Sequence, residues 1–239
     1  MFLTNLSTIF YSMTIRCIAF DLDDTLWECH PVIKRAEQCF YDWLKIVYPK
    51  ICQKYSDVAL IEHRIAYTQS QADFHHDLTT LRKSWMGLLA DEFGYSHALV
   101  DSGFEVFWLA RNEVTFFDGT IGILEDLASR YSLGVITNGN ADVHHIGVGY
   151  LFDFTLSSET AGVSKPHPDI FHQAIKLSKF ELGETIYVGD DPKRDIIGAQ
   201  KAGMKAIWYN PNNQIWQEQE KPFATINHLS ELEEKIRGI

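Results

Sequence analysis

The chain has 239 residues and a mass of 27.4 kDa, which suits one large domain or a core with a modest insertion. Apolar residues make up 46% and aromatic residues 13% of it, enough for a packed core and too much for a disordered chain. Acidic side chains outnumber Lys and Arg by 32 to 21, so the net charge is −11. Because a nucleic-acid backbone requires a basic surface, we expect no nucleic-acid partner.

The sequence shows no pattern typical of a targeting signal or of paired cysteines. Apolar runs are short and interrupted, so we expect no membrane partner. The first dozen residues contain no Lys or Arg and have polar breaks, unlike a secretory signal, and we interpret residues 1–13 as an N-terminal extension. The four cysteines show no C-x-x-C spacing, which favours free thiols in a reducing compartment. We expect a cytoplasmic protein that is a monomer or a weak homo-oligomer.

Near-continuous apolar runs that end in polar residues predict strands buried on both faces of a parallel sheet. Such runs occupy residues 14–20, 133–137, 185–189 and 205–209. In the later part of the chain, helical patterns occur at residues 121–131, 168–178 and 194–202. This alternation predicts an α/β core with a Rossmann-like parallel sheet, formed by residues 14–28 and 116–239.

The stretch of residues 29–115 differs from the rest because it contains no strand-like run. Pro31 suits the first turn of a helix, and apolar residues then recur on one helical face. Further helical patterns cover residues 57–71, 81–93 and 100–112. We therefore expect an all-helical cap domain over residues 29–115, inserted after the first strand.

Two carboxylates, Asp21 and Asp23, follow the first strand. In open α/β sheets, functional groups lie beyond the carboxyl ends of the strands. One carboxylate of such a pair can attack a substrate while the other moves a proton. The alternative interpretation is a pair of turn-forming aspartates that cap the next element.

The second strand run ends in Thr137 and Asn138, directly before a helical pattern. A hydroxyl and free backbone N–H groups at such a junction can bind an anion, although an ordinary helix cap is the alternative. Lys165 precedes a later helix and, taken alone, is typical of a solvated side chain. Asp190 and Asp195 follow the next strand run. Because clustered carboxylates repel each other, this acidic group favours a hard cation such as Mg²⁺.

In this order, the four motifs resemble those of the haloacid dehalogenase-like superfamily, and the resemblance covers essentially the whole chain beyond Met13. The helical insert directly after the first motif is similar to the subclass I cap of that superfamily. The matching motifs are residues 20–26, Thr137 with Asn138, Lys165, and Asp190 with Asp195.

The resemblance implies a Mg²⁺-dependent phosphomonoester hydrolase that forms an aspartyl-phosphate on Asp21. Asp23 would protonate the leaving alkoxide and then activate water. Asp21, the backbone carbonyl of Asp23 and Asp190 would hold Mg²⁺. Related sequences carry the metal-facing carboxylate at either position of the Asp190-Asp191 pair, so Asp191 stays an alternative ligand.

The same resemblance assigns the phosphoryl oxygens to Thr137, Asn138 and Lys165. Asp195 would act indirectly, by orienting Lys165 or a metal-bound water. The founding dehalogenases of the superfamily lack an aspartate at the position of Asp23, so phosphate transfer is favoured over a 2-haloacid dehalogenase. A phosphomutase and a non-catalytic binding protein remain alternatives on the same fold.

Residues of the cap and its hinge offer two candidates for contact with the substrate. Arg82 lies in a polar stretch before a helix, where its planar guanidinium suits an anionic or carbonyl group. A solvated Arg at a helix end is the alternative. Trp27 follows the first motif and is expected to line the mouth of the site.

A narrower resemblance concerns the substrate, which we expect to be a small phosphorylated metabolite. Several stretches are similar to bacterial phosphatases that act on flavin mononucleotide and on 5-amino-6-(5-phospho-D-ribitylamino)uracil. These stretches are residues 30–33, 76–79, 137–140 and 189–191. The resemblance carries over no individual substrate-binding residue.

Overall fold

The computed structural model describes residues 14–71 and 75–238, and within them six strands form one parallel sheet in the order β3-β2-β1-β4-β5-β6. The predicted α/β fold class is therefore confirmed. The register places Phe20 beside Val135 and Val188, so the central strands end level with one another. The strands are β1 (Cys17–Phe20), β2 (Ser132–Thr137), β3 (Phe154–Ser157), β4 (Thr185–Gly189), β5 (Lys205–Tyr209) and β6 (Ala224–Ile226).

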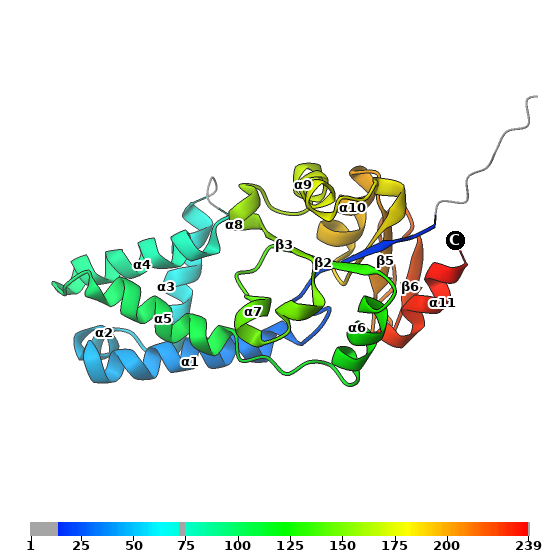
Figure 1. Cartoon of the computed structure of the whole chain (residues 1–239). Coiled ribbons are helices and arrows are strands. Elements are labelled where there is room, and N and C mark those ends of the chain that lie inside the picture. The colour runs from blue at the N-terminus through cyan, green and yellow to red at the C-terminus, as the bar shows by residue number, and fades with distance from the viewer. Residues whose placement is uncertain (1–13, 72–74, 239) are drawn as a thin grey trace, which may run out of the picture.

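Helices cover both faces of the sheet (Figure 1). One face packs against α6 (Thr120–Ala128) and α11 (Leu232–Arg237), and the other against α9 (Pro168–Ser178) and α10 (Gly198–Lys201). Alternate residues of β1 point into the two cores, which is the period of two expected for a strand buried on both sides. The shorter elements are α7 (Val143–Ile146), η2 (Gly149–Leu151), α8 (Ser158–Ala161), η3 (Leu182–Glu184), η4 (Pro192–Ile197) and η5 (Leu229–Glu231).

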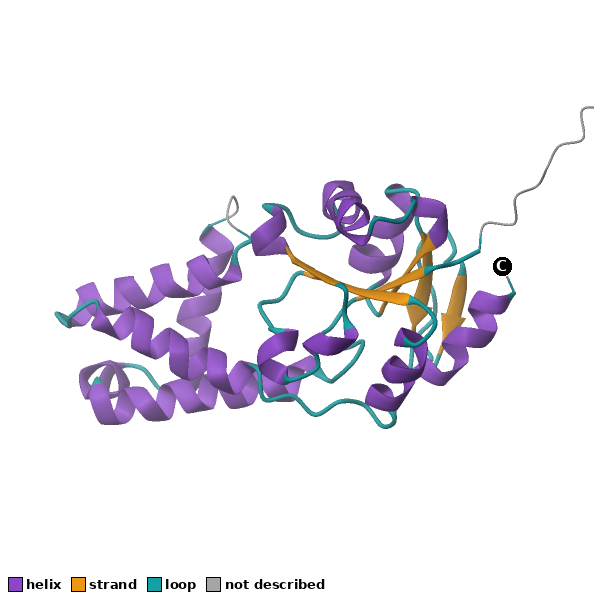
Figure 2. Cartoon of the chain, in the orientation of Figure 1, coloured by secondary structure: helices purple, strands orange, loops and turns teal. Residues whose placement is uncertain are grey.

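Five helices between β1 and α6 form a bundle beside the sheet, as Figure 2 shows. Their shared core contains Phe40, Trp85 and Phe107. Gly103 allows close helix packing, because a Cβ there would meet a ring carbon of Phe40 at 2.9 Å. The helices are α1 (Cys29–Val47), α2 (Pro49–Lys54), α3 (Asp57–Ser70), α4 (Leu78–Phe93) and α5 (Ala98–Arg111).

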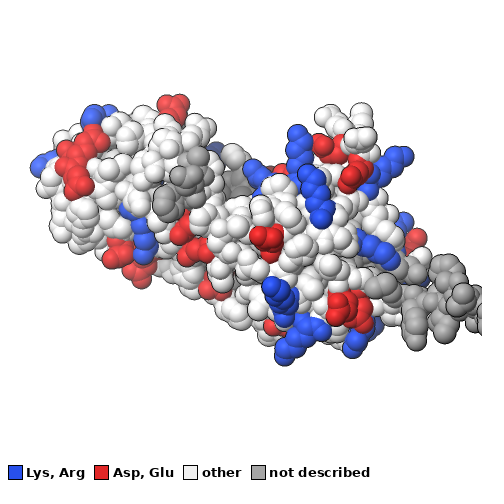
Figure 3. All heavy atoms as spheres, turned by 90° about the horizontal axis from the view of Figure 1, so that it is seen from above, with Lys and Arg blue, Asp and Glu red and all other residues white. Residues whose placement is uncertain are grey.

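The bundle agrees with the predicted helical cap, while its proposed boundaries at residues 29 and 115 stay a prediction. The proposed N-terminal extension, residues 1–13, lies outside the described residues. No helix in the described part of the chain is long and apolar enough to cross a membrane. On the face drawn in Figure 3, basic and acidic side chains are interspersed, and no continuous basic surface is seen there.

The sequence patterns did not predict the two edge strands, β3 and β6. They have four and three residues, and exposed side chains interrupt each of them, so neither contains a continuous apolar run. The helix predicted over residues 194–202 begins earlier, at Pro192, with one π-helical segment before α10. That segment carries Asp195 toward the end of β4.

Candidate active site

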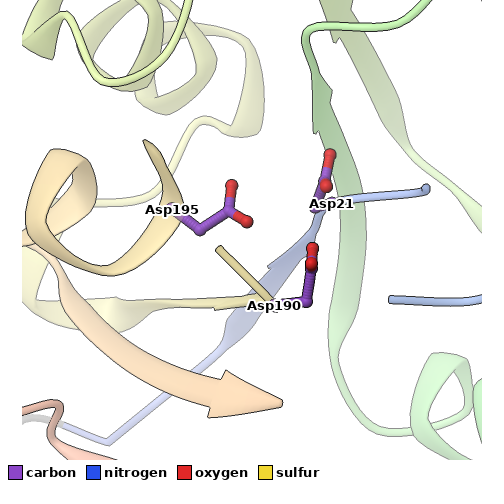
Figure 4. Close-up of side chains that lie close together, drawn as sticks. All are labelled: Asp21, Asp190 and Asp195. Atoms are coloured by element: carbon purple, nitrogen blue, oxygen red, sulfur yellow. The ribbon is translucent and has the colours of Figure 1, made fainter. Parts of the chain in front are cut away.

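The sequence motifs meet in one cavity of about 280 Å³ beyond the ends of β1, β2 and β4. Parallel strands deliver their carboxyl ends to one edge of the sheet, which explains why residues so distant in the sequence converge. Figure 4 shows three of the carboxylates around one space. The predicted site residues that line this cavity are Asp21, Asp23, Thr137, Asn138, Lys165, Asp190, Asp191 and Asp195.

Lys165 lies at the centre of a buried hydrogen-bond network. Its Nζ donates to Oδ1 of Asp21 at 2.7 Å, to Oδ1 of Asp195 at 2.7 Å and to the hydroxyl of Tyr187 at 2.8 Å. Burial disfavours the charged ammonium, but the carboxylates of Asp195 and Asp21 outweigh it and raise the pKa of Lys165. Lys165 therefore stays protonated, and three acceptors account for its three N–H groups.

The loop that carries Lys165 is fixed by Asn138. The side-chain Oδ1 of Asn138 accepts from the backbone N–H of Lys165 at 2.8 Å, and its Nδ2 donates to the Lys165 carbonyl at 2.9 Å. Thr137 is buried, and its Oγ1 accepts from the backbone N–H of Gly139 at 3.0 Å. The side chain of Asn138 thus joins two motifs, while phosphoryl binding by its backbone N–H and by Thr137 stays a prediction.

Three carboxylates, those of Asp21, Asp190 and Asp195, have oxygen atoms within 4.8 Å of one another. Burial, with Lys165 opposing and Asp195 reinforcing it, raises the pKa of Asp21 to about 7. Burial and the nearby charges of Asp195 and Asp21 raise the pKa of Asp190 to about 8. Such a cluster of carboxylate oxygens gains most from a hard divalent cation, so the donor set fits Mg²⁺.

Asp195 and Asp191 have other partners. Oδ1 of Asp195 accepts from Lys165, and its Oδ2 accepts from the backbone N–H of Asp191 at 3.0 Å. Asp191 itself caps η4 and accepts from the N–H groups of Lys193 and Arg194, both at 2.8 Å. Asp21 and Asp190 belong to the cluster of three close carboxylates and each has one oxygen without a hydrogen bond among the described residues, whereas Asp191 lies outside that cluster. The assignment of metal ligands stays a prediction.

Asp23 is held from two sides. Its Oδ1 accepts from Nε1 of Trp27 at 2.9 Å, and its Oδ2 accepts from Nη2 of Arg111 at 2.6 Å. The expectation that Trp27 lines the mouth of the site is wrong, because this side chain is fully buried. The sequence patterns did not predict a role for Arg111, which is 1% exposed at the end of α5. Basic residues are common in the last turn of a helix, so its position in the sequence gives no signal.

Arg82 is also buried, so the alternative of a solvated helix-end Arg is wrong. Its Nη2 lies 2.7 Å from Oε1 of Glu37, and its guanidinium carbon lies 3.3 Å from the ring centroid of Phe107. Arg82 lines a second cavity of about 260 Å³ next to the first. Its role as a substrate contact stays a prediction.

The fold and this arrangement of residues define a hydrolase of the haloacid dehalogenase type. A family model described as haloacid dehalogenase-like hydrolase matches residues 15–203, and the chain belongs to this family. It is 32% identical over 230 residues to the 5-amino-6-(5-phospho-D-ribitylamino)uracil phosphatase YigB of Escherichia coli, covering 91% of this chain and 94% of that protein. It is 26% identical to a glyceraldehyde 3-phosphate phosphatase of Pyrococcus abyssi, covering 82% and 81%. These matches confirm the predicted family and support the predicted phosphatase class.

Solved structures agree on the fold. The crystal structure of a 2-haloacid dehalogenase from Pseudomonas syringae superposes with a TM-score of 0.88 at 39% identity, covering 94% of this chain and 99% of that chain. The magnesium-bound putative hydrolase YfnB of Bacillus subtilis gives a TM-score of 0.67 at 21% identity, with 94% and 99% coverage, and supports the fold alone.

Proposed function

We propose that this chain is a Mg²⁺-dependent phosphomonoester hydrolase that acts through an aspartyl-phosphate on Asp21. The observation that carries the proposal is the pair of carboxylates at the end of β1. Asp21 is buried against Lys165, whereas Asp23 is held by Trp27 and Arg111 at the side of the cap. A nucleophile and a proton-transfer group thus occupy different sides of one cavity.

In the first half-reaction, an oxygen of Asp21 forms a bond to phosphorus while the bond from phosphorus to the leaving oxygen breaks. Lys165 already binds Oδ1 of Asp21, which leaves Oδ2 for the attack. The departing alkoxide takes its proton from Asp23. A bound Mg²⁺, held by Asp21 and Asp190, would neutralise charge on the phosphoryl group.

In the second half-reaction, Asp23 removes a proton from water, which attacks phosphorus and releases phosphate from Asp21. The hydrogen bonds that Asp23 accepts from Trp27 and Arg111 fix the position of its carboxylate, and a general base must be positioned in this way. In this proposal, the positive charge of Lys165 and the N–H groups near Thr137 stabilise the charge that develops on the phosphoryl oxygens.

For the substrate we infer a small phosphorylated metabolite, with 5-amino-6-(5-phospho-D-ribitylamino)uracil and flavin mononucleotide as the leading candidates. The coverage of the Escherichia coli relative supports this inference, because it extends over both the core and the cap. A 2-haloacid dehalogenase is the second candidate, favoured by the name of the Pseudomonas syringae structure. Asp23 weighs against it, because an ester route that needs no proton transfer to a leaving alkoxide has no use for this carboxylate.

Release of phosphate and of halide from a substrate panel separates these candidates. We expect phosphate from one or both leading candidates with Mg²⁺, loss of that activity in EDTA, and no chloride from 2-chloropropionate. The variant Asp21→Asn should lose about 10⁴-fold or more in turnover while remaining folded. Metal-independent chloride release without phosphate release would instead establish the dehalogenase.

A further inference from the structure

Two cavities meet at Asp23. The site cavity and the second cavity of about 260 Å³ share Asp23, Cys29, Leu78 and Gly139 in their linings. The second cavity extends from this border between the cap helices and the loop after β2. Because a general acid must contact the leaving oxygen, the leaving group of a bound phosphomonoester extends from Asp23 into this second cavity.

Three arginines line the second cavity, and they differ in how they are paired. Arg64 and Arg82 share one partner, because Glu37 lies 3.1 Å from Nε of the first and 2.7 Å from Nη2 of the second. Arg111 donates to Asp23 through Nη2 alone. Its Nη1 is buried and has no hydrogen-bond partner among the residues that the structure describes. Nε of Arg64 also makes no hydrogen bond there, but it faces the carboxylate of Glu37 at 3.1 Å.

An unpaired N–H group on a side chain that is 1% exposed is costly unless a ligand satisfies it. The guanidinium is a rigid fork whose two terminal nitrogens are neighbours. A group bound by Nη1 therefore lies beside the group bound by Nη2, which is the general acid. In a bound ester, the atoms two or three bonds beyond the leaving oxygen would occupy that place.

We propose that Arg111 is a specificity-determining residue. Its Nη1 donates a hydrogen bond to an acceptor oxygen on the carbon next to the ester carbon of the leaving group. The substrate class is that of phosphorylated polyols and hydroxycarbonyl compounds, rather than simple alkyl phosphates. This inference rests on the proposed phosphatase function. Nη2 of Arg111 orients Asp23 at the same time, so one guanidinium links the choice of substrate to the position of the acid.

Two esters that differ by one hydroxyl group test the inference. Glycerol 3-phosphate has a hydroxyl on the carbon next to the ester carbon, and 1,3-propanediol monophosphate lacks it. With Mg²⁺ present, we expect the wild-type chain to favour glycerol 3-phosphate in kcat/KM by about 10-fold or more, the range of a hydrogen bond to a charged group. The variants Arg111→Lys and Arg111→Met should bring this ratio close to one.

Loss of rate alone does not reveal a substrate contact, because Arg111 also positions Asp23. The ratio of the two esters is therefore the readout, together with p-nitrophenyl phosphate, whose leaving group needs little protonation. Arg111→Lys keeps a positive charge near Asp23 and should retain more of the rate on all three esters than Arg111→Met. The matched control Arg64→Lys changes an arginine of the same cavity that is paired with Glu37, and it should keep the wild-type ratio.

Three outcomes would overturn the inference. They are a wild-type ratio near one, an unchanged ratio in the folded Arg111 variants, and a ratio that disappears in Arg64→Lys instead. Phosphate release from other esters under these conditions would leave the proposed function standing. If the wild-type chain releases no phosphate from any ester, the proposed function itself is wrong, and this inference is wrong with it.

Discussion

Nζ of Lys165 lies 2.7 Å from Oδ1 of Asp21, although the two residues are 144 positions apart in the chain. This contact affects the ionisation of Asp21, the proposed nucleophile. Burial raises the pKa of Asp21, and the ammonium of Lys165 opposes that rise, leaving it at about 7. A buried carboxylate is a strong nucleophile only while it is ionised, so in the proposed mechanism Lys165 favours the reactive form of Asp21.

Replacing Asp23 should separate substrates by their leaving groups. In Asp23→Asn, we expect kcat/KM for an alkyl phosphate to fall by about 10²–10⁴-fold, the usual contribution of general acid–base catalysis. For p-nitrophenyl phosphate the fall should be much smaller, because that leaving group departs without a proton. The measurement is kcat/KM, which reports the first phosphoryl transfer and does not depend on the later hydrolysis of the aspartyl-phosphate.

An equal loss on both esters would contradict the general-acid role of Asp23. The control is Asp24→Asn, because this neighbouring carboxylate accepts from the backbone N–H of Cys29 at 2.8 Å and is engaged in the local turn. Its variant should affect the two esters alike.

Local sequence patterns were sufficient to predict which side chains gather at the carboxyl ends of the strands. Asp21 and Thr137 each end an apolar run, and a parallel sheet brings such ends together whatever the sequence distance. The supporting residues could not be predicted in this way. Arg111 reaches Asp23 from the last turn of a cap helix, and Tyr187 reaches Lys165 from inside β4. Their roles depend on packing between distant segments, which no spacing in the sequence encodes.

Gly139 should be intolerant of a side chain. A Cβ there would lie 2.7 Å from Oδ2 of Asp23 and 3.2 Å from Nη2 of Arg111, so it would displace the acid from its partner. We expect Gly139→Ala to lower kcat/KM for alkyl phosphates by about 10-fold or more, with a smaller effect on p-nitrophenyl phosphate. Gly122→Ala is the matched control, because nothing lies within 4 Å of a Cβ in that part of α6. Equal activity of the two variants would show that Asp23 need not occupy this position.

Removing the hydroxyl of Tyr187 should cost stability. This hydroxyl contacts Nζ of Lys165 at 2.8 Å and lies 3.1 Å from both the Ile136 carbonyl and Oδ1 of Asp195. Because these groups are buried, Tyr187→Phe should lower the free energy of unfolding by about 1–3 kcal/mol, measured in urea with Mg²⁺ present. Tyr150→Phe is the control, since its exposed hydroxyl binds only Glu125 among the described residues. A Tyr187→Phe chain as stable as that control would mean that Lys165 finds another acceptor.

The metal should stabilise the chain more at high pH than at low pH. The pKa values of Asp21 and Asp190 are raised from 3.8 to about 7 and about 8, so without metal the native state retains protons that the unfolded state has lost. These groups therefore stabilise the fold below about pH 4, and their contribution is lost as the pH rises toward 8.

A bound cation replaces those protons, so the rise in Tm on adding Mg²⁺ in place of EDTA should be larger at pH 8 than at pH 6. In Asp190→Asn the EDTA-treated chain should lose less stability over this range, and its response to Mg²⁺ should be weak at both pH values. A rise in Tm that is the same at pH 6 and pH 8 in the wild-type chain would mean that Mg²⁺ does not displace protons from Asp21 and Asp190.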